Sequence, residues 1–313
     1  METFIGIAIG GTKTSITYAQ YDGVLFSNIE KEVIKTTPTD DKKTIQDIFN
    51  VIDNSFSVSK LDGISIIVGS PIDNVKGLIL KPPHLPGFNK TPIVKLFRDK
   101  YKTKVTLLND ADASALAEYK FGNHKDANNL VYFTFGTGFG SGLILNGKLY
   151  TGKNGMAGEI GHLRLDNKGP IGYGKKGSVE GYIAGGNIPK LVAKYSHKCP
   201  DSNLLKKYDT DKLTAKDVFF EARNNDELAL KVIDLICKQL GRTCAIAIDL
   251  LNPDYVVIGG IYPRNLDLLE TKTLKHAKKE SISLNYKNCK IVPSNLKDNI
   301  DEYSSLVPLI RED

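Results

Sequence analysis

Two distant segments of the chain repeat one pattern of hydrophobic and polar positions. Each has an apolar strand, a glycine-rich turn and a second apolar strand: residues 4–18 read FIGIAIGGTKTSITY, and residues 130–145 read LVYFTFGTGFGSGLIL. The turns contain Gly10, Gly11, Thr12 and Lys13 in the first segment and Gly136, Thr137, Gly138, Gly140 and Gly142 in the second. Because glycine has no Cβ, consecutive backbone N–H groups can point into one concavity, as a bound polyphosphate requires. The repeat predicts two related halves that bind one nucleotide.

Strands and helices alternate after the first hairpin. Apolar residues at helical spacing predict helices, and short apolar runs bounded by turn residues predict strands. The expected elements are a helix at 39–56, a strand at 63–73, a helix at 93–100, a strand at 104–110 and a helix at 111–119. The stretch KPPHLPGF at 81–88 is too rich in proline for regular structure. This order predicts an α/β domain with a mostly parallel sheet.

A second unit is expected to begin at about residue 125. Residues 152–186 are rich in glycine and irregular, which in a compact domain usually marks a functional site. Residues 195–213 are polar and predict a surface loop. A long helical pattern at 226–251 leads into a strand at 254–260 that ends in paired glycines.

The composition is that of an ordinary globular protein. With 313 residues, of which 41% are hydrophobic, the chain can bury cores in two domains. We expect no signal peptide and no membrane span, because the N-terminus enters a strand directly and no apolar run is long enough. The four cysteines are scattered, and Cys237 and Cys244 lie seven apart in a helical pattern that predicts buried thiols. A cytoplasmic protein fits these features.

The charge of the chain does not indicate a nucleic-acid partner. The formal net charge is +6, and the lysines are interspersed with acidic residues. A nucleic-acid interface would be better supported by a clustered basic face with aromatic residues between the charges. We therefore expect a solvated lysine-rich surface and neither a nucleic-acid nor a membrane partner.

Asp110 is the first candidate for catalysis. It follows Asn109 where a predicted strand ends and a predicted helix begins. At such a position an aspartate can simply cap the helix. It can also act as a general base that accepts the proton of an attacking hydroxyl during phosphoryl transfer. The local sequence leaves both interpretations open, and one residue can serve both roles.

Two further pairs have a structural and a functional interpretation. Glu159 and His162 are three apart, so on a helical turn they face the same way, as a surface ion pair or as ligands of adjacent sugar hydroxyls. Gly259 and Gly260 follow a predicted strand, where they can allow close packing or the approach of a nucleotide. Neither pair decides the question by itself.

Taken in order, the motifs resemble the ROK family. They are IGGTK, GSPID, PPHLPGF, LLNDADASA, GTGFGSG, AGEIGH, a glycine-rich loop that ends in Glu180, and VVIGG. The resemblance extends from residue 5 to about 260. It implies an α/β fold of the hexokinase superfamily, with two actin-like ATPase (ribonuclease H-like) domains and an active-site cleft between them. The expected domains are residues 1–120 and 121–296, with a C-terminal helix at about 297–313 that packs back on the first.

The resemblance also implies an activity: phosphorylation of a hexose or N-acetylhexosamine by ATP with Mg²⁺, most simply at the C6 hydroxyl. Asp110 then matches the catalytic base. The implied sugar-binding residues are Gly69, Asn109, Asp110, Glu159, His162 and Glu180. The implied nucleotide-binding residues are Gly10, Gly11, Thr12, Lys13, Thr137, Gly138, Gly259 and Gly260. A homodimer is expected, and the motifs do not choose among glucose, N-acetylmannosamine, N-acetylglucosamine and allose.

One departure from the family pattern concerns magnesium. ROK proteins usually carry an aspartate two residues before the glycine pair, where it helps to hold the cation and the phosphates, but this chain has Ala8. A methyl group cannot coordinate a cation. There are three explanations for Ala8: another acidic residue takes the place of the aspartate, catalysis is weakened, or the natural residue was changed. Asp110 is the nearest remaining acid, with Asp73 a more distant one, and we expect a natural variant that keeps activity.

A second departure concerns zinc. Many ROK proteins pair the histidine of the GH motif with three cysteines, whereas this chain has IGYGKKGS, with Ile171, Tyr173 and Ser178 at the thiol positions. These side chains do not form a tetrahedral zinc site beside His162. We expect no structural zinc, a loop held by packing that involves Tyr173, and a His162 free to bind the sugar.

Two other functions remain as hypotheses. ROK repressors carry a helix-turn-helix domain before the IGGTK strand, and here about three residues precede that strand, so we do not expect a repressor. The other hypothesis is a catalytically silent protein that binds a sugar or a nucleotide, which Ala8 favours. The retained Asn109–Asp110 pair argues against it, because binding alone needs no base.

Overall fold

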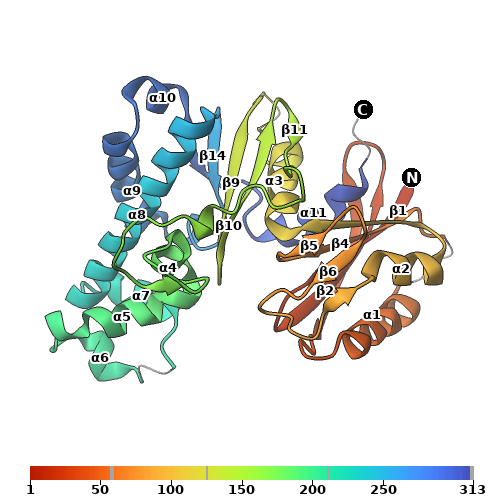
Figure 1. Cartoon of the computed structure of the whole chain (residues 1–313), viewed down its shortest axis with the longest axis horizontal. Coiled ribbons are helices and arrows are strands. Elements are labelled where there is room, and N and C mark those ends of the chain that lie inside the picture. The colour runs from red at the N-terminus through yellow and green to blue at the C-terminus, as the bar shows by residue number, and fades with distance from the viewer. Residues whose placement is uncertain (57–59, 125, 210–211, 311–313) are drawn as a thin grey trace. The chain divides into compact units, whose positions relative to one another are not determined.

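The computed structural model describes residues 1–56, 60–124, 126–209 and 212–310, and it divides into two compact units (Figure 1). Unit 1 contains Met1–Phe121, Leu149–Ala157 and the chain from Asp298 on. Unit 2 contains Gly122–Lys148 and Gly158–Lys297. Each unit has one five-stranded sheet with helices packed on it, and the two are described separately.

The sheet of unit 1 begins with the first predicted hairpin. Its strands are β1 (Glu2–Ile9), β2 (Lys13–Tyr21), β3 (Phe26–Lys35), β4 (Gly63–Val68) and β8 (Lys104–Asn109), in the order β3-β2-β1-β4-β8. Strand β2 is antiparallel to both β1 and β3, whereas β1–β4 and β4–β8 are parallel. The predicted parallel pairing is confirmed for β1, β4 and β8, which belong to the alternation of strands and helices, and it does not extend to β2 and β3. The first three strands follow one another through short turns, and such turns can only join antiparallel neighbours.

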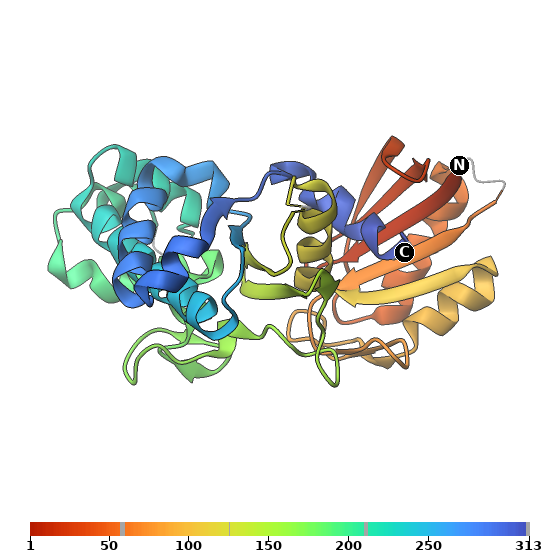
Figure 2. The ribbon, with the colours of Figure 1, turned by 90° about the horizontal axis from the view of Figure 1, so that it is seen from above.

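Helices cover both faces of this sheet. They are α1 (Asp41–Ser55), α2 (Ile93–Tyr101), α3 (Asp110–Phe121) and α11 (Ile300–Leu306). Side chains alternate along β1, so Ile5 and Ile7 join the core beneath α1 and α2, and Phe4 points to the opposite face. There Phe4 packs with Leu306 and Leu309, which brings the C-terminal segment back to the first strands (Figure 2).

A small antiparallel sheet surrounds the proline-rich loop of unit 1. Its strands are β5 (Ile72–Asp73), β6 (Leu78–Leu80) and β7 (Asn89–Thr91), and residues 81–88 connect the last two without regular structure, as predicted. Leu85 and Phe88 are fully buried. They anchor the loop, so its intervening residues have a defined place at the end of the main sheet.

Unit 2 repeats the arrangement of unit 1. Its sheet contains β9 (Leu130–Phe135), β10 (Phe139–Leu145), β11 (Lys148–Leu149), β14 (Tyr255–Ile258) and β15 (Lys290–Pro293), in the order β11-β10-β9-β14-β15. Here too an antiparallel hairpin, β9–β10, is continued by parallel strands, β14 and β15. The two predicted hairpins are confirmed and occupy equivalent positions in their sheets.

A long pair of helices supports the sheet of unit 2. Helix α8 (Glu227–Leu251) packs against α9 (Leu266–Glu280), and Gly241 allows the close approach, because a Cβ there would lie 2.5 Å from the Cβ of His276. The predicted thiols Cys237 and Cys244 of α8 are buried, as expected. The remaining regular elements are α4 (Val179–Ile183), α5 (Ile188–Tyr195), α6 (Asn203–Lys207), α7 (Ala215–Arg223), α10 (Ser283–Asn288), β12 (Ile171–Gly172) and β13 (Lys175–Lys176).

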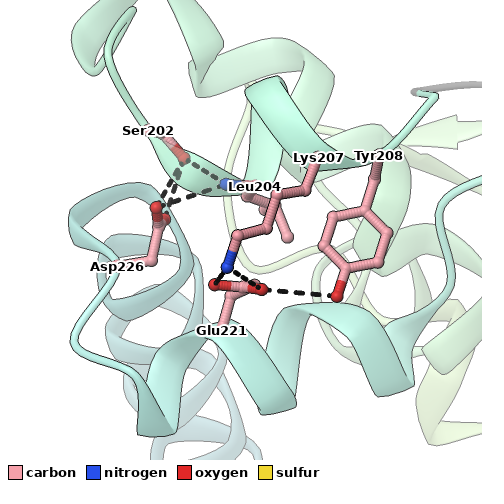
Figure 3. Close-up of polar contacts among 6 residues, drawn as sticks. All are labelled: Ser202, Leu204, Lys207, Tyr208, Glu221 and Asp226. Carbon is pink, nitrogen blue, oxygen red and sulfur yellow. Dashed lines mark hydrogen bonds and ion pairs between the residues drawn. The ribbon is translucent and has the colours of Figure 1, made fainter.

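The polar stretch at 195–213 is not simply a surface loop, because it contains α6. The hydroxyl of Ser202 caps this helix and also donates to the buried carboxylate of Asp226 at 2.9 Å (Figure 3). Lys207 and the Tyr208 hydroxyl bond to Glu221 of α7 at 3.1 and 3.3 Å. Polar residues hold this segment, so its hydrophobic pattern did not reveal the helix. Among the described helices, none is both long and apolar enough to cross a membrane.

Candidate active site

In unit 1 the candidate residues follow three neighbouring strands. The register pairs Ile9 with Val68 and Val68 with Asn109, so β1, β4 and β8 end side by side. Gly10, Gly69 and Asp110 are the next residues, respectively. Ligands of α/β proteins bind at the carboxyl ends of parallel strands. The structure therefore brings together the unit 1 residues that the sequence predicted.

Asn109, and not Asp110, caps helix α3. The Asn109 Oδ1 accepts hydrogen bonds from the backbone N–H groups of Ala111 at 2.8 Å and Asp112 at 3.3 Å, and its Nδ2 donates to Ser70 Oγ at 2.8 Å. Asp110 is the first residue of the helix, its Oδ1 accepts from the Ala111 N–H at 2.9 Å, and its side chain is exposed. Helix capping, the structural interpretation of Asp110, is thus the role of its neighbour Asn109.

His84 of the proline-rich loop lies beside Asp110. The Cβ position of Gly69 is 2.7 Å from His84 Cε1 and 3.7 Å from Asp110 Oδ2, so the imidazole and the carboxylate face the same small space. A Cβ on Gly11 would lie 2.8 Å from the His84 carbonyl oxygen. A side chain at position 11 would therefore clash with the backbone of the loop, and one at position 69 would displace the His84 ring. The loop thus lies against both the glycine turn of residues 10–13 and Gly69 at the end of β4.

The surroundings of this pair shift the pKa values of both groups. Removal of water by the surrounding protein raises the pKa of Asp110, and the nearby His84 charge and the Ala111 N–H oppose that rise. Desolvation lowers the pKa of His84, and the Asp110 charge opposes it. Both side chains are exposed to solvent, so the removal of water around them is incomplete.

The first glycine turn is closed by its own backbone. The Gly10 N–H donates to the Lys13 carbonyl at 3.0 Å, and Thr12 and Lys13 between the strands are exposed. Ala8, two residues earlier, lies within β1 opposite Ser15 and Ile67. The turn therefore presents a hydroxyl, an ammonium group and backbone N–H groups, which suit phosphate oxygens.

In unit 2, three candidate side chains gather around one hairpin. Glu159 precedes a 3₁₀ turn at Ile160–His162, as expected for residues three apart, and the His162 N–H donates to the Glu159 carbonyl at 3.1 Å. Glu180 lies in α4, which Ser178 caps. Burial raises the pKa of Glu180, whereas hydrogen bonds from the Tyr173 hydroxyl and the Phe139 N–H lower it.

The second glycine turn joins this group. The Gly136 N–H donates to the Gly138 carbonyl at 3.1 Å, and a Cβ on Gly138 would lie 3.2 Å from Glu180 Oε2. Gly185 and Gly186 after α4 donate to the carbonyls of Gly136 and Thr137 at 2.8 and 3.0 Å. Thr137 and Gly138 remain exposed, so this turn can also receive a phosphate or a hydroxyl.

Gly259 and Gly260 have a packing role. A Cβ on Gly259 would overlap the Tyr132 hydroxyl, and one on Gly260 would overlap the Phe135 carbonyl. Gly260 also has a φ of 67°, in the left-handed region that favours glycine. The close-packing interpretation thus explains both residues, and their approach to a nucleotide stays a prediction.

The residues at the family's metal positions do not fit the metals. Ile171 is exposed, Ser178 donates to the Gly172 carbonyl at 3.1 Å, and Tyr173 stacks on His162, so these side chains offer no thiolate or imidazole set for zinc. Ala8 offers no ligand to magnesium. Among the described residues, no group of three or more histidine, cysteine or acidic side chains could hold a metal ion.

Two side chains of the site had weaker sequence signals. In the sequence, His84 is one residue of the proline-rich stretch at 81–88, and Tyr173 stands at a position where many ROK proteins have a thiol. Their contacts with Asp110 and His162 depend on the folding of loops that have no periodic pattern. A lone histidine or tyrosine in a glycine- or proline-rich loop is the signal that could have singled them out.

Two five-stranded sheets of the same strand order, each with a glycine turn at the carboxyl end of its first strand, define an α/β protein of the actin-like ATPase fold. A sequence profile of the ROK family matches residues 4–300. The chain belongs to the ROK family, as the motifs indicated.

Its relatives include enzymes and regulators. The chain is 34% identical over 266 residues to a glucokinase of Halalkalibacterium halodurans, covering 82% of this chain and 79% of that protein. It is 25% identical over 308 residues to a xylose repressor of Caldicellulosiruptor bescii, covering 95% of this chain and 75% of the repressor. A Streptomyces griseus ROK glucokinase, solved with glucose and AMPPNP, superimposes with a TM-score of 0.81 at 22% identity, over 97% of this chain and 98% of that one. This last likeness concerns the fold.

Proposed function

We propose that the chain is an ATP-dependent sugar kinase that phosphorylates a hexose or an N-acetylhexosamine at the C6 hydroxyl. The observation that carries the proposal is the exposed Asp110 carboxylate at the end of β8, next to the helix cap that Asn109 supplies and in the same row of strand ends as the glycine turn of residues 10–13. Kinship with the Halalkalibacterium halodurans glucokinase supports it.

In the proposed reaction, Asp110 accepts the proton of the sugar hydroxyl while the hydroxyl oxygen attacks the γ-phosphorus. A phosphorus–oxygen bond forms to the sugar, and the bond to the departing ADP breaks in line with it. The Asn109 bonds to Ser70 and to the N-terminus of α3 fix the backbone that carries the carboxylate. Base catalysis of this kind contributes on the order of 10²–10⁴ in rate.

Each unit has its own proposed hydroxyl-binding residues. They are Gly69, Asn109 and Asp110 in unit 1, and Glu159, His162 and Glu180 in unit 2. A carboxylate accepts hydrogen bonds from hydroxyls, whereas an amide or a neutral imidazole can both accept and donate. The two glycine turns, with Gly259 and Gly260, supply the phosphate and adenosine contacts. When bound, the Mg²⁺ of Mg–ATP neutralises charge on the phosphates.

The test is identification of the product. The protein is incubated with Mg–ATP and each of glucose, N-acetylmannosamine, N-acetylglucosamine and allose, and the phosphorylated carbon is assigned by ³¹P–¹H NMR. We expect one or more 6-phosphate esters. If no sugar phosphate forms with any of them, the proposal is wrong for this panel and the silent-binder hypothesis is favoured.

Ala8 is the observation that favours a silent sugar or nucleotide binder. Calorimetry would then detect sugar binding without turnover, and Ala8→Asp would restore phosphorylation. Similarity to the xylose repressor suggests a regulatory role as a further alternative.

We also propose a homodimer, for which sedimentation should give twice the chain mass of 34.4 kDa.

A further inference from the structure

Tyr173 lies beside two of the three proposed sugar-binding residues that follow the second hairpin, His162 and Glu180. Its ring stacks on the His162 imidazole, with centroids 4.2 Å apart and planes inclined by 16°. The same ring lies next to Gly161, where a Cβ would come within 3.2 Å of Tyr173 Cε2. Any larger residue at position 161 would therefore disturb the stack.

The other end of Tyr173 reaches Glu180. Burial raises the pKa of Glu180, and the nearby hydroxyl and backbone of Tyr173 act to lower it, so Tyr173 favours the ionised carboxylate. The carboxylate also accepts from the Phe139 N–H at 3.4 Å, which belongs to the second glycine turn. One side chain thus connects the histidine of the 3₁₀ turn, the glutamate of α4 and the hairpin β9–β10.

The loop that carries Tyr173 is held by polar contacts. Strands β12 and β13 pair Ile171 with Lys176, and Tyr173 between them has a φ of 51°, an unusual conformation for a residue with a Cβ. Lys175 Nζ donates to the His162 carbonyl at 2.6 Å, and Ser178 Oγ to the Gly172 carbonyl at 3.1 Å. These bonds hold the loop on the C-terminal side of Tyr173 and so restrict the position of its ring. Such strained residues concentrate at functional sites.

We propose that Tyr173 is a positioning residue for the sugar: without a metal ion, it orients His162 by stacking and Glu180 by hydrogen bonding. The inference rests on the proposed function. A stacked imidazole keeps both nitrogens, which point outward in the ring plane, for hydrogen bonds with hydroxyls. A carboxylate held by a hydroxyl is oriented before the ligand arrives, which reduces the ordering cost of binding.

Two variants separate the two contacts. Tyr173→Phe keeps the stack and removes the bond to Glu180, and we expect the Kd for the sugar to rise about fivefold to tenfold. Tyr173→Leu removes both contacts, and we expect a rise of about thirtyfold or more. The KM for ATP should stay unchanged in both. Lys176→Ala, on the same hairpin with an exposed side chain, is the matched control and should leave the Kd unaltered.

A spectroscopic readout tests the geometry without activity. The chain has five histidines, so the His162 ring protons can be assigned in the ¹H–¹³C spectrum by comparison with His162→Gln. An aromatic ring stacked at 4.2 Å should shift them upfield in the wild type and in Tyr173→Phe, but not in Tyr173→Leu. The wild-type Kd for the sugar should also survive exhaustive dialysis against EDTA.

The outcomes separate this inference from the function on which it rests. If the wild-type chain binds no sugar, both fail. If it binds a sugar and Tyr173→Leu binds it equally well, or if His162 shows no ring-current shift, the positioning role alone is overturned. Loss of sugar binding on dialysis against EDTA would also overturn the inference, because a metal would then hold the site.

Discussion

At the scale of single residues, the proposed chemistry depends on the division of labour between Asn109 and Asp110. Asn109 accepts from the N–H groups of Ala111 and Asp112 at the start of α3, and Asp110 Oδ1 shares the Ala111 N–H. Asp110 keeps an exposed side chain beside His84. A residue that only capped the helix could be exchanged for asparagine at little cost, whereas a base could not.

Asp110→Asn should therefore abolish catalysis without abolishing binding. An amide can hydrogen-bond to the hydroxyl but cannot take its proton, so we expect kcat to fall by about 10²–10⁴, with a change in sugar Kd of about tenfold at most. Steady-state kinetics and calorimetry measure the two quantities. Asp99→Asn, an exposed aspartate of α2, is the control and should behave as wild type. A variant with normal kcat would exclude Asp110 as the base.

His84 should control the acid limb of the pH–rate profile. A base with a raised pKa loses activity as the pH falls through that pKa, at a higher pH than an ordinary aspartate would. The charge of His84 grows as the pH falls and favours the ionised form of Asp110. In His84→Asn this charge is absent, so the pKa of Asp110 should rise and the acid limb of the log kcat/KM profile should move to higher pH. An unmoved limb, or one at lower pH, would contradict the pairing.

At the scale of elements, the sequence predicted those segments whose pattern and turn residues agree. The hairpins β1–β2 and β9–β10 and helix α8 were evident, because alternating or helical apolar positions ended at glycine or a capping residue. Helix α6 was missed because its stability comes from Ser202, Lys207 and Tyr208 rather than from an apolar stripe. The parallel pairing was predicted where helices separate the strands, at β1–β4 and β4–β8, whereas the antiparallel strand β3 has no counterpart among the predicted elements.

The same reasoning limits prediction of the site. Asp110, Glu159 and His162 lie beside recognisable strand ends and turns, so motif order could find them. The positions of His84 and Tyr173 depend on tertiary contacts, namely the space left by Gly69 and the stack over Gly161. No local pattern records a contact between residues from different loops.

Asp226 should stabilise the start of α8. It accepts bonds from Ala229 N–H at 2.9 Å, Leu204 N–H at 3.3 Å and Ser202 Oγ, so Asp226→Ala should lower the free energy of unfolding by about 1–2 kcal/mol at pH 7. Urea unfolding followed by circular dichroism measures this loss. Asp226→Asn, which keeps an acceptor, should lose less.

The Asp226 contribution should also depend on pH. Partial burial acts to raise the pKa of Asp226, but the hydrogen bonds outweigh it and leave the pKa below its usual range. A carboxyl with a lowered folded-state pKa stabilises the fold above its unfolded pKa of about 4, and that stabilisation is lost as the pH falls through the folded pKa. The difference between wild type and Asp226→Ala should therefore shrink below about pH 4. A constant difference would contradict the linkage.

At the scale of the whole molecule, each of the two similar sheets carries its own group of candidate residues. Unit 1 contains Asp110, its neighbour His84 and one glycine turn, whereas unit 2 contains Glu159, His162, Glu180 and the other turn. ROK relatives include a glucokinase and a xylose repressor, so the family alone does not decide between catalysis and regulation. What favours catalysis is the Asp110 carboxylate, which sugar binding alone does not require.

The most direct test of this account is the rate of ADP release from Mg–ATP, measured for wild type and Asp110→Asn side by side across hexoses and N-acetylhexosamines. We predict sugar-dependent release by the wild type with at least one sugar, despite Ala8, and loss of that release in Asp110→Asn. Sugar binding by calorimetry without ADP release from the wild type would contradict the central claim.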